Sequence, residues 1–311
     1  MTTSDNFPTV STVPRRALHH WSTRRREANI GWLFVLPALA VYAMFVLLPL
    51  VLSIQYSFFR WNGITSMVWV GLKNYRTIFT VPDLLGTIFN AFGLVVFFSF
   101  IPVTLGLVVA SLMHRVAPGR LGAVSRTVLF LPQVIPLVAA GIIWGWLLSL
   151  PGLINQLLGG VGLGAFTRAW LGDFNWALPA VGIIGTWVVT GFCTVLLVTA
   201  MTKIDPSLYE SARIDGSGWF TEFVRITIPL LRHEIGVCLT VTVIAALAAF
   251  DIVYVTTAGG PGNSTAVPGI QIYILAFTEQ RIGLASALAV MLMLLVLLVI
   301  LPIQRLSRES S

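Results

Sequence analysis

Six of the long stretches without Asp, Glu, Lys or Arg in this 311-residue chain are candidates for membrane spans. They are residues 28–59, 84–114, 127–167, 174–202, 235–250 and 282–304. Most of them exceed the length of about 20 residues that a helix needs to cross the hydrocarbon core of a bilayer. Charged residues make up 10% of the chain and hydrophobic residues 57%, against about 25% and 45–50% in an average soluble domain. The pattern predicts an all-α membrane protein and excludes a soluble enzyme built around a single core.

The charge-free stretches predict six transmembrane helices, so both termini lie on the same side of the membrane. The helices are expected near residues 30–54, 87–113, 124–149, 177–201, 231–255 and 283–303. The side with the termini collects fourteen of the nineteen Lys and Arg residues, and the other side holds Arg60, Lys73, Arg76, Arg168 and Arg281. Because cytoplasmic loops are enriched in Lys and Arg, we expect both termini in the cytoplasm. The net charge of +7 therefore reflects membrane topology and does not indicate nucleic-acid binding.

The same pattern predicts three regions along the chain. Residues 1–29 are polar and rich in arginine, and we expect a disordered basic cytoplasmic tail. Residues 30–303 form the transmembrane domain, and residues 304–311 a short cytoplasmic tail. The apolar stretch after residue 29 is too long for a cleavable signal peptide, whose apolar region has about 7–15 residues. The first span is therefore expected to remain in the mature protein.

Few polar groups lie inside the predicted spans. Asp251, near the outer end of the fifth predicted helix, is either a structural hydrogen-bond acceptor or part of a solute path, because a buried carboxylate is costly without a partner. Gln133 lies between Pro132 and Pro136, and this segment is either a broken helix facing a polar cavity or a simple packing kink. Apart from Asp251, the predicted spans carry almost none of the midplane charges that an ion-coupled transporter uses.

The loop at about residues 203–229 predicts two short helices. Asp205 is a favourable N-cap and Pro206 a favourable first helical residue. Gly216 can adopt the left-handed conformation that ends such a helix. A second helix is expected from about Trp219 to Pro229, where the chain turns into the fifth span. The result is a helix-turn-helix lying across the cytoplasmic face.

Specific residues of this loop resemble the Glu-Ala-Ala signature of permease subunits in binding-protein-dependent ABC importers. They are Glu210, Ser211, Ala212, Asp215, Gly216 and, further along, Phe223, Ile226 and Pro229. Ser211 replaces the usual alanine, which is one small residue for another. Other matches are Gly71 to Tyr75, Leu131 to Pro136, Phe250, Asp251 and Tyr254, Gly259 to Thr265, and Ala285 to Ala289. Together they resemble the sugar-importer branch, in particular the maltose-transporter-type first permease subunit.

The resemblance implies a type I ABC importer permease fold with a cytoplasmic coupling helix between spans four and five. The expected ATPase-coupling residues are Glu210, Ser211, Ala212, Asp215, Gly216 and Pro229. The implied partners are a second permease subunit in a heterodimer, a cytoplasmic ABC ATPase dimer and an extracytoplasmic solute-binding protein. An ordinary amphipathic helix at the membrane interface is the alternative for the loop alone.

The chain itself carries no motif for ATP hydrolysis. A P-loop requires Gly-Lys followed by Ser or Thr, and the only two lysines, Lys73 and Lys203, follow Leu72 and Thr202. No Ser/His/acid set and no His/Cys set has catalytic or metal-ligand spacing. Cys193 and Cys238 are interpreted as small buried hydrophobic residues. We therefore expect a transport subunit without enzymatic activity, metal or cofactor, whose partner ATPase uses ATP and Mg²⁺.

The sequence thus predicts half of a permease pair that imports a sugar, with a di- or oligosaccharide favoured by the branch resemblance. The candidate residues of the substrate path are Gln133, Trp187, Thr190, Asp251 and Tyr254. Aromatic faces cover the apolar face of a sugar and polar groups replace its lost water contacts. Glycerol-phosphate esters are an alternative cargo. The second candidate function, a stand-alone secondary transporter or channel, is less favoured because no inverted repeat stands out. A membrane-embedded enzyme is the third candidate function.

Overall fold

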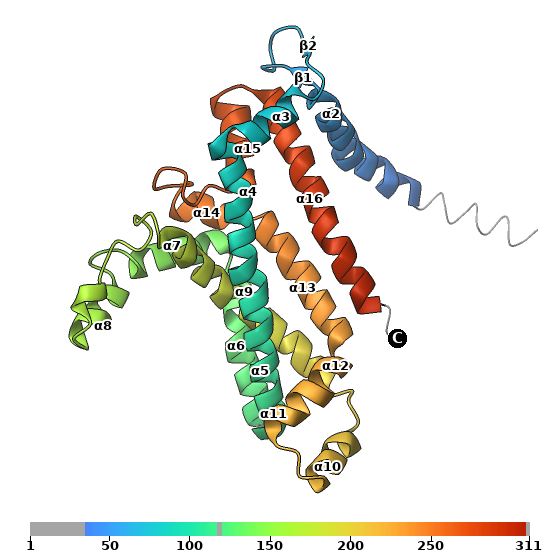
Figure 1. Cartoon of the computed structure of the whole chain (residues 1–311), viewed down its shortest axis with the longest axis vertical. Helices are drawn as coiled ribbons and strands as arrows, with labels where there is room; N and C mark the ends of the chain where they lie inside the picture. Colours follow the sequence, from blue (N-terminus) through green and yellow to red (C-terminus); the bar gives the residue numbers. More distant parts are fainter. Residues whose placement is uncertain (1–34, 117–119, 309–311) are drawn as a thin grey trace, which may run out of the picture. The chain divides into compact units, whose positions relative to one another are not determined.

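A computed structural model describes residues 35–116 and 120–308, and helices form nearly all of their regular structure (Figure 1). The predicted tail at residues 1–29 lies outside the described residues. The chain divides into two units, residues 1–52 and 53–311. The described part of the first unit belongs to one apolar helix, Val35–Tyr56, which includes the π-helical turn η1 (Ala43–Leu47) and α2 (Leu48–Tyr56). No side chain of η1 or α2 is buried, and their surface is apolar, as a lipid-facing helix requires.

The second unit begins with a short antiparallel hairpin and continues as helices. Its first half contains β1 (Phe59–Arg60), β2 (Val68–Trp69), α3 (Lys73–Thr80), α4 (Pro82–Val95), η2 (Val96–Phe100), α5 (Ile101–Val116), α6 (Arg120–Val134), α7 (Leu137–Leu147), α8 (Leu153–Gly160) and η3 (Gly164–Phe166). Its second half contains α9 (Ala177–Met201), α10 (Pro206–Ile214), α11 (Trp219–Glu222), η4 (Phe223–Thr227), α12 (Ile228–Leu230), α13 (Arg232–Leu247), α14 (Asp251–Thr256), α15 (Pro268–Tyr273), η5 (Ile274–Thr278) and α16 (Ile282–Arg308). In the hairpin, Phe59 pairs with Trp69 and Arg60 with Val68.

Helix α9 is at the centre of the core of the second unit. It packs against α5 and α6, and its bounds agree with the predicted helix at 177–201. Two glycines allow close approach: a Cβ at Gly185 would overlap the ring of Phe98, and a Cβ at Gly191 would overlap the carbonyl oxygen of Leu129 on α6. Small residues let membrane helices approach closely in this way. Helix α9 is therefore packed too tightly on both sides to accept larger residues at these positions.

The third predicted helix, 124–149, is broken. Its parts α6 and α7 are bent by 94° at Ile135 and Pro136. Pro136 has no backbone N–H, and it disfavours the helical conformation at the residue before it. Of the two alternatives for this segment, the structure therefore has the broken helix.

The prediction of a fifth helix at residues 231–255 is wrong about where the helix ends. Helix α13 stops at Leu247, and Asp251 begins a separate helix, α14. No Pro or Gly lies between residues 244 and 254, so the sequence carries no local signal for this break. Instead, α15 packs over it: a Cβ at Gly269 would lie 3.3 Å from the Cβ of Phe250 and 3.6 Å from the carbonyl oxygen of Ala249. Tertiary packing thus ends the helix, and Asp251 then gains a favourable place in the first turn of the next one.

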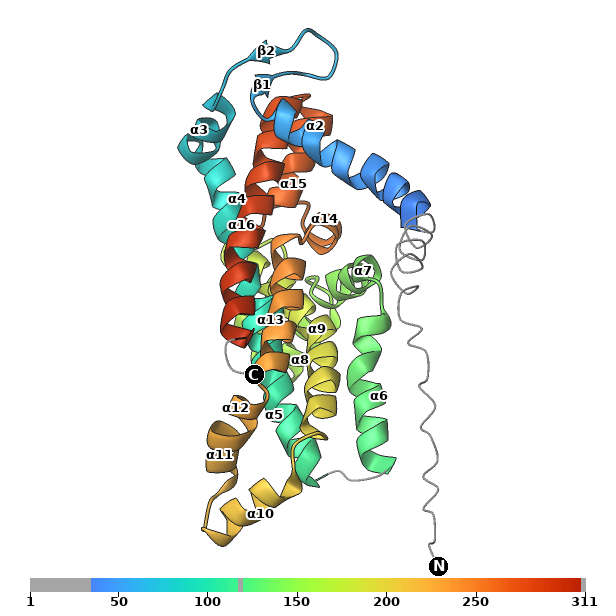
Figure 2. The ribbon, with the colours of Figure 1, turned by 90° about the vertical axis from the view of Figure 1, so that its right-hand side faces the viewer.

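Four described helices are long and apolar enough to cross a membrane, or up to six spans result if each bent pair counts as one. The two bent pairs are α6 with α7 and the α11–α12 segment with α13, the latter bent by 73°. The last helix continues to Arg308, so the boundary expected at residue 303 falls inside α16. Helices α10 and α11 lie at one end of the second unit and the β1–β2 hairpin lies at the other (Figures 1 and 2).

Candidate functional site

Helix α10 has the two ends that its sequence predicts. The Asp205 carboxylate accepts a hydrogen bond of 3.0 Å from the backbone N–H of Ser207, which holds the pKa of Asp205 below its usual range. At the other end Gly216 has φ +78°. The Gly216 N–H donates to the carbonyl of Arg213 at 3.0 Å and the Ser217 N–H to that of Ala212 at 2.9 Å. This is the Schellman pattern of bonds, so the helix stops at a defined residue.

The inner side of α10 is tied to neighbouring helices by polar contacts. The ring of Tyr209 is buried, and its hydroxyl lies 3.1 Å from the hydroxyl oxygen of Thr227 on η4. The Arg213 Nε donates to the buried Glu222 carboxylate at 3.1 Å. The Tyr209 ring also lies 5.7 Å from the ring of His114 on α5. These contacts hold α10 against both α5 and η4.

Helix α11 adds a second attachment to α5. The indole N–H of Trp219 donates to the Ser111 hydroxyl at 3.0 Å, and the Trp219 ring stacks on Phe223 at 5.3 Å. Loop 203–229 is therefore attached to α5 and continues through η4 and α12 into α13.

The outer side of the loop is open. Glu210, Ser211, Asp215, Gly216 and Pro229 are exposed and Ala212 is half-buried. Within α10 Tyr209 is the only buried residue, whereas Leu208 and Ile214 of α10 and Phe220 of α11 are exposed at 46%, 87% and 69%. Acidic and apolar groups thus share a surface that no described residue covers.

The sequence did not single out Glu222. This residue is 4% exposed and joins the two short helices through Arg213. The two residues lie nine positions apart, a spacing that matches neither the i,i+4 nor the i,i+3 pairing within one helix. An acid at the end of a short, otherwise apolar helix is the only sequence signal that could have indicated a partner.

The candidate path residues come from helices that touch one another. Helices α7, α9 and α14 are in mutual contact, and α6 packs on α9. Trp187 on α9 is 36% exposed and lies edge-on to Trp144 of α7, with ring centroids 5.6 Å apart. Thr190 is half-buried and donates to the Thr186 carbonyl at 2.6 Å. Gln133 is exposed at the end of α6, directly before the break.

Asp251 and Tyr254 lie on α14, and both are exposed. No hydrogen-bond partner for the Asp251 carboxylate occurs among residues 35–116 and 120–308. Tyr254 belongs to a ladder of aromatic rings that the sequence did not indicate, because two of its members come from α15 and η5. Phe250 stacks on Tyr254 at 5.2 Å, Tyr254 meets Tyr273 edge-on at 5.6 Å, and Tyr273 lies 5.3 Å from Phe277.

The Gly-rich loop after α14 is fixed by polar contacts. The Thr257 and Thr265 hydroxyls are 2.7 Å apart, and the Asn90 side chain donates to the carbonyls of Asn263 at 3.2 Å and Ala266 at 2.9 Å. The Gly260–Pro261 peptide bond is cis. The loop is therefore a defined surface feature next to the aromatic ladder.

The two cysteines are both free and buried. Among the described residues, no three His, Cys, Asp or Glu side chains form a group that could hold a metal ion.

Known proteins resemble the chain over most of its length. Residues 102–309 match the family described as "Binding-protein-dependent transport system inner membrane component". A probable ABC transporter permease protein of Bacillus subtilis (strain 168) is 33% identical over 267 residues, covering 85% of this chain and 91% of the relative. The diacetylchitobiose uptake system permease protein of Streptomyces coelicolor is 33% identical over 307 residues, covering 93% and 87%. The trehalose/maltose transport system permease protein of Thermococcus litoralis is 34% identical over 275 residues, covering 86% and 89%.

A solved structure supports the fold independently. It is a chain of a bacterial ABC transporter involved in the import of the acidic polysaccharide alginate, and it superposes with a TM-score of 0.78 over 93% of this chain and 98% of that chain. The sequence identity is 23%, so the likeness concerns the fold alone. The family match and the relatives of 33–34% identity show that the chain belongs to the family of inner membrane components of binding-protein-dependent transport systems.

Proposed function

We propose that the chain is the permease subunit of an ATP-driven importer that carries a sugar across the bacterial inner membrane. The chain is a multi-pass protein of this membrane by its family and its apolar helices. The single observation that carries the proposal is loop 203–229, whose inner side is tied to α5 and η4 while its outer acidic and apolar side is open. Such a surface can dock a partner by shape and charge.

In the proposed mechanism, α10 is the coupling helix and sits on one subunit of a cytoplasmic ATPase dimer. The groups offered to that subunit are Glu210, Ser211, Ala212, Asp215 and Gly216, and Pro229 helps to set the turn into α13. Closure of the ATPase pair on ATP and Mg²⁺ would displace α10. The contacts of Tyr209, Glu222 and Trp219 would then move α5 and α13 with it. If the chain has six spans and both termini in the cytoplasm, as we propose, the loop lies on the ATPase side.

The proposed solute path runs beside α7, α9 and α14, between this chain and a second permease. Gln133, Trp187, Thr190, Asp251 and Tyr254 would line it. Three relatives are named for the transport of sugars: diacetylchitobiose, trehalose or maltose, and lactose. The exposed Tyr254 ring and the free Asp251 carboxylate are suited to the apolar face and the hydroxyls of a sugar ring. We therefore propose a di- or oligosaccharide as cargo, delivered by an extracytoplasmic binding protein.

Reconstitution of the chain tests this function. The chain would be placed in liposomes with a second permease, the ATPase and the binding protein from the same gene cluster, and uptake of radiolabelled disaccharides and glycerol phosphate would be measured with and without ATP. We expect uptake of a sugar only when all subunits and ATP are present. ATP-independent flux through the chain alone would refute the proposal, and uptake of glycerol phosphate alone would correct the cargo.

A further inference from the structure

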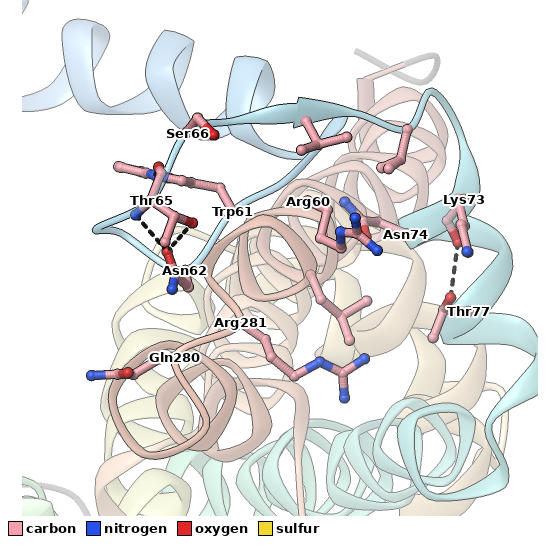
Figure 3. A pocket seen from close by; sticks show the side chains of 13 residues that line it. Arg60, Trp61, Asn62, Thr65, Ser66, Lys73, Asn74, Thr77, Gln280 and Arg281 are labelled. Atoms are coloured by element: carbon pink, nitrogen blue, oxygen red, sulfur yellow. Dashed lines mark hydrogen bonds between the residues drawn. The ribbon is translucent and has the colours of Figure 1, made fainter.

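A polar pocket of about 550 Å³ lies at the end of the second unit that carries the hairpin (Figure 3). Its walls come from the β1–β2 hairpin, from α3 and from the start of α16. Arg60, Lys73 and Arg281 each enter it from a different wall, and Asn62, Asn74 and Gln280 add amide groups. None of the thirteen lining residues is acidic.

The charge of this pocket stands out because the extracytoplasmic side has few basic residues. Three of the five Lys and Arg residues assigned to that side line the pocket, and a fourth, Arg76, lines an adjoining hollow together with Lys73. Arg281 has one acidic neighbour, Glu279, at 3.4 Å, and both side chains are about half exposed. Among the described residues, Arg60 and Lys73 have no ion-pair partner. The pocket therefore carries positive charge that the described residues neutralise only in part, at Arg281.

The walls of the pocket are fixed by hydrogen bonds. The Asn74 side chain donates to the carbonyls of Ser57 at 2.8 Å and Phe59 at 2.9 Å, which joins α3 to β1. The Gly283 N–H donates to the Trp61 carbonyl at 3.2 Å, which joins α16 to the hairpin. The Asn62 carboxamide oxygen accepts from the backbone N–H of Thr65 at 2.9 Å and closes the turn. A preformed site loses little entropy on binding.

We infer that this pocket, lined by Arg60, Lys73 and Arg281, receives carboxylate side chains from the extracytoplasmic solute-binding protein. The inference rests on the proposed function, since it requires such a partner. Cations that face outward from a preformed wall attract an acidic protein surface, speed its arrival and fix its register. Docking at this end brings the binding protein to the same side of the membrane as the entry of the proposed path.

The lining favours a protein carboxylate over the other sources of negative charge. An anionic lipid needs an apolar groove for its acyl chain beside the headgroup site, whereas nine of the thirteen lining residues are polar. The cargo itself is placed elsewhere, because the proposed path residues lie on α6, α9 and α14 and none of them lines this pocket. The hydrogen-bonded hairpin that forms one wall is also a suitable surface for another protein.

The test uses the complete importer in nanodiscs of neutral phosphatidylcholine, with its fluorescently labelled binding protein. The variant Arg60→Glu/Lys73→Glu reverses two charges at exposed positions, and Arg60→Gln/Lys73→Gln removes them. We expect Kd for the binding protein to rise by about tenfold or more for the reversed pair at low salt. The difference in Kd between the reversed pair and the wild type should shrink as NaCl approaches about 0.5 M, because salt screens exposed charges. The neutral pair should lie between the wild type and the reversed pair.

Arg168→Glu is the matched control. Compared with Arg60→Glu alone, it makes the same change of charge on the same side, but Arg168 lies over the rings of Trp170 and Trp176 and does not line the pocket. Its Kd should equal that of the wild type. Expression and ATPase assembly of all variants are checked by size-exclusion chromatography, and a charge-swapped Glu→Lys or Asp→Lys variant of the binding protein should restore binding to the reversed pair.

Three results would overturn the inference. The first is an unchanged Kd for the reversed pair while the binding protein still stimulates ATP hydrolysis by the wild-type importer. The second is a defect that appears only after phosphatidylglycerol is added, which would assign the pocket to a lipid headgroup. The third is a changed KM for the sugar at unchanged Kd, which would assign it to the cargo. If the wild-type importer neither binds the protein nor responds to it, the proposed function itself fails.

Discussion

Loop 203–229 and the α14–α15 region both present exposed candidate residues, but different forces hold them in place. The loop is fixed by directional polar contacts: Tyr209 to Thr227, Arg213 to Glu222 and Trp219 to Ser111. On α14, Tyr254 is held by stacked and edge-on rings, whereas polar contacts fix only the Gly-rich loop that follows. Hydrogen bonds weaken steeply when their geometry changes, whereas aromatic pairs accept a range of arrangements. The difference favours a rigid loop at residues 203–229 and a more adaptable packing of the rings around Tyr254.

The strongest test of a rigid loop is Gly216→Val. Gly216 has φ +78°, and the left-handed conformation costs a residue with a Cβ about 1–2 kcal/mol, more for a β-branched one. The loop would leave the geometry that closes α10, so we expect ATP-driven uptake to fall by about tenfold or more, since 1.4 kcal/mol corresponds to a factor of ten. ATP hydrolysis should continue without uptake, and both rates would be measured in proteoliposomes.

Gly218→Val is the control for this substitution. Gly218 has extended backbone, with φ −84° and ψ 168°, and an added Cβ would have no neighbour within 4 Å. The same side chain is therefore accepted two residues away, and uptake should stay close to that of the wild type. Normal coupling in Gly216→Val would show that the loop does not need a fixed end to transmit force.

Tyr254→Ala tests the adaptable region. The substitution removes the ring that links Phe250 to Tyr273, and with it a face that could stack on a sugar. Because an aromatic pair contributes about 0.5–1.5 kcal/mol beyond its buried area, we expect KM for uptake to rise about threefold to tenfold. Stimulation of ATP hydrolysis by the binding protein should be unchanged. Tyr254→Phe, which keeps the ring, should retain most of the uptake; equal losses in both variants would point to the hydroxyl instead.

Asp251→Ala separates the two roles that the sequence left open for this carboxylate. If Asp251 lines the path, uptake should fall by a factor of about three, the value of one lost hydrogen bond at an exposed site, while the amount of assembled importer stays the same. Asp251→Asn keeps an acceptor oxygen and should retain part of the activity. A loss of assembled complex in both variants, measured by co-purification with the ATPase, would favour a structural role.

The features that the sequence predicted well are those with a local cause. Pro206 after Asp205 begins α10, Gly216 ends it, Pro136 breaks the third span, and a run without charges defines α9 from Ala177 to Met201. Each of these depends on the backbone chemistry or the hydropathy of a few neighbouring residues.

The features that it missed depend on residues far apart in the chain. The break before Asp251 is made by packing of Gly269 on Phe250, and the aromatic ladder joins Tyr254 to Tyr273 across the Gly-rich loop. The pocket at the hairpin needs Arg60 and Arg281 from opposite ends of the chain. No periodicity in one segment can indicate such neighbours. The candidate coupling residues lie in one loop, so more of them could be named from the sequence than of the residues proposed to line the solute path.

Glu222→Gln tests whether the polar attachment of the loop matters for coupling. The change keeps the shape of the side chain but removes the charge that accepts from Arg213. Because Arg213 is half exposed, solvent screens the pair, and we expect the unfolding free energy to fall by only about 1 kcal/mol. The number of sugars moved per ATP should fall about twofold to threefold. Glu210→Gln, at an exposed position of the same loop, should not change thermal stability. An equal loss of thermal stability in Glu210→Gln would mean that the charge alone, and not the internal pair, is responsible.

The smallest effect is expected at the N-cap of α10. Asp205 accepts the Ser207 N–H, and this bond keeps the pKa of Asp205 low. A carboxyl whose pKa is lower in the folded state stabilises the fold above its unfolded pKa of about 3.9 and loses this contribution as pH falls through the folded value. At neutral pH the contribution is fully present, so Asp205→Ala should speed amide exchange in the first turn of α10, whereas Asp205→Asn, which keeps an acceptor, should not. Uptake should change little in either variant, because Tyr209 and the Arg213–Glu222 pair still hold the helix.

Exchange at the Ser207 amide in the wild type should approach that of Asp205→Ala only below about pH 4. Faster exchange already near neutral pH would mean that this carboxylate does not cap α10. It would also contradict a loop that is fixed by polar contacts.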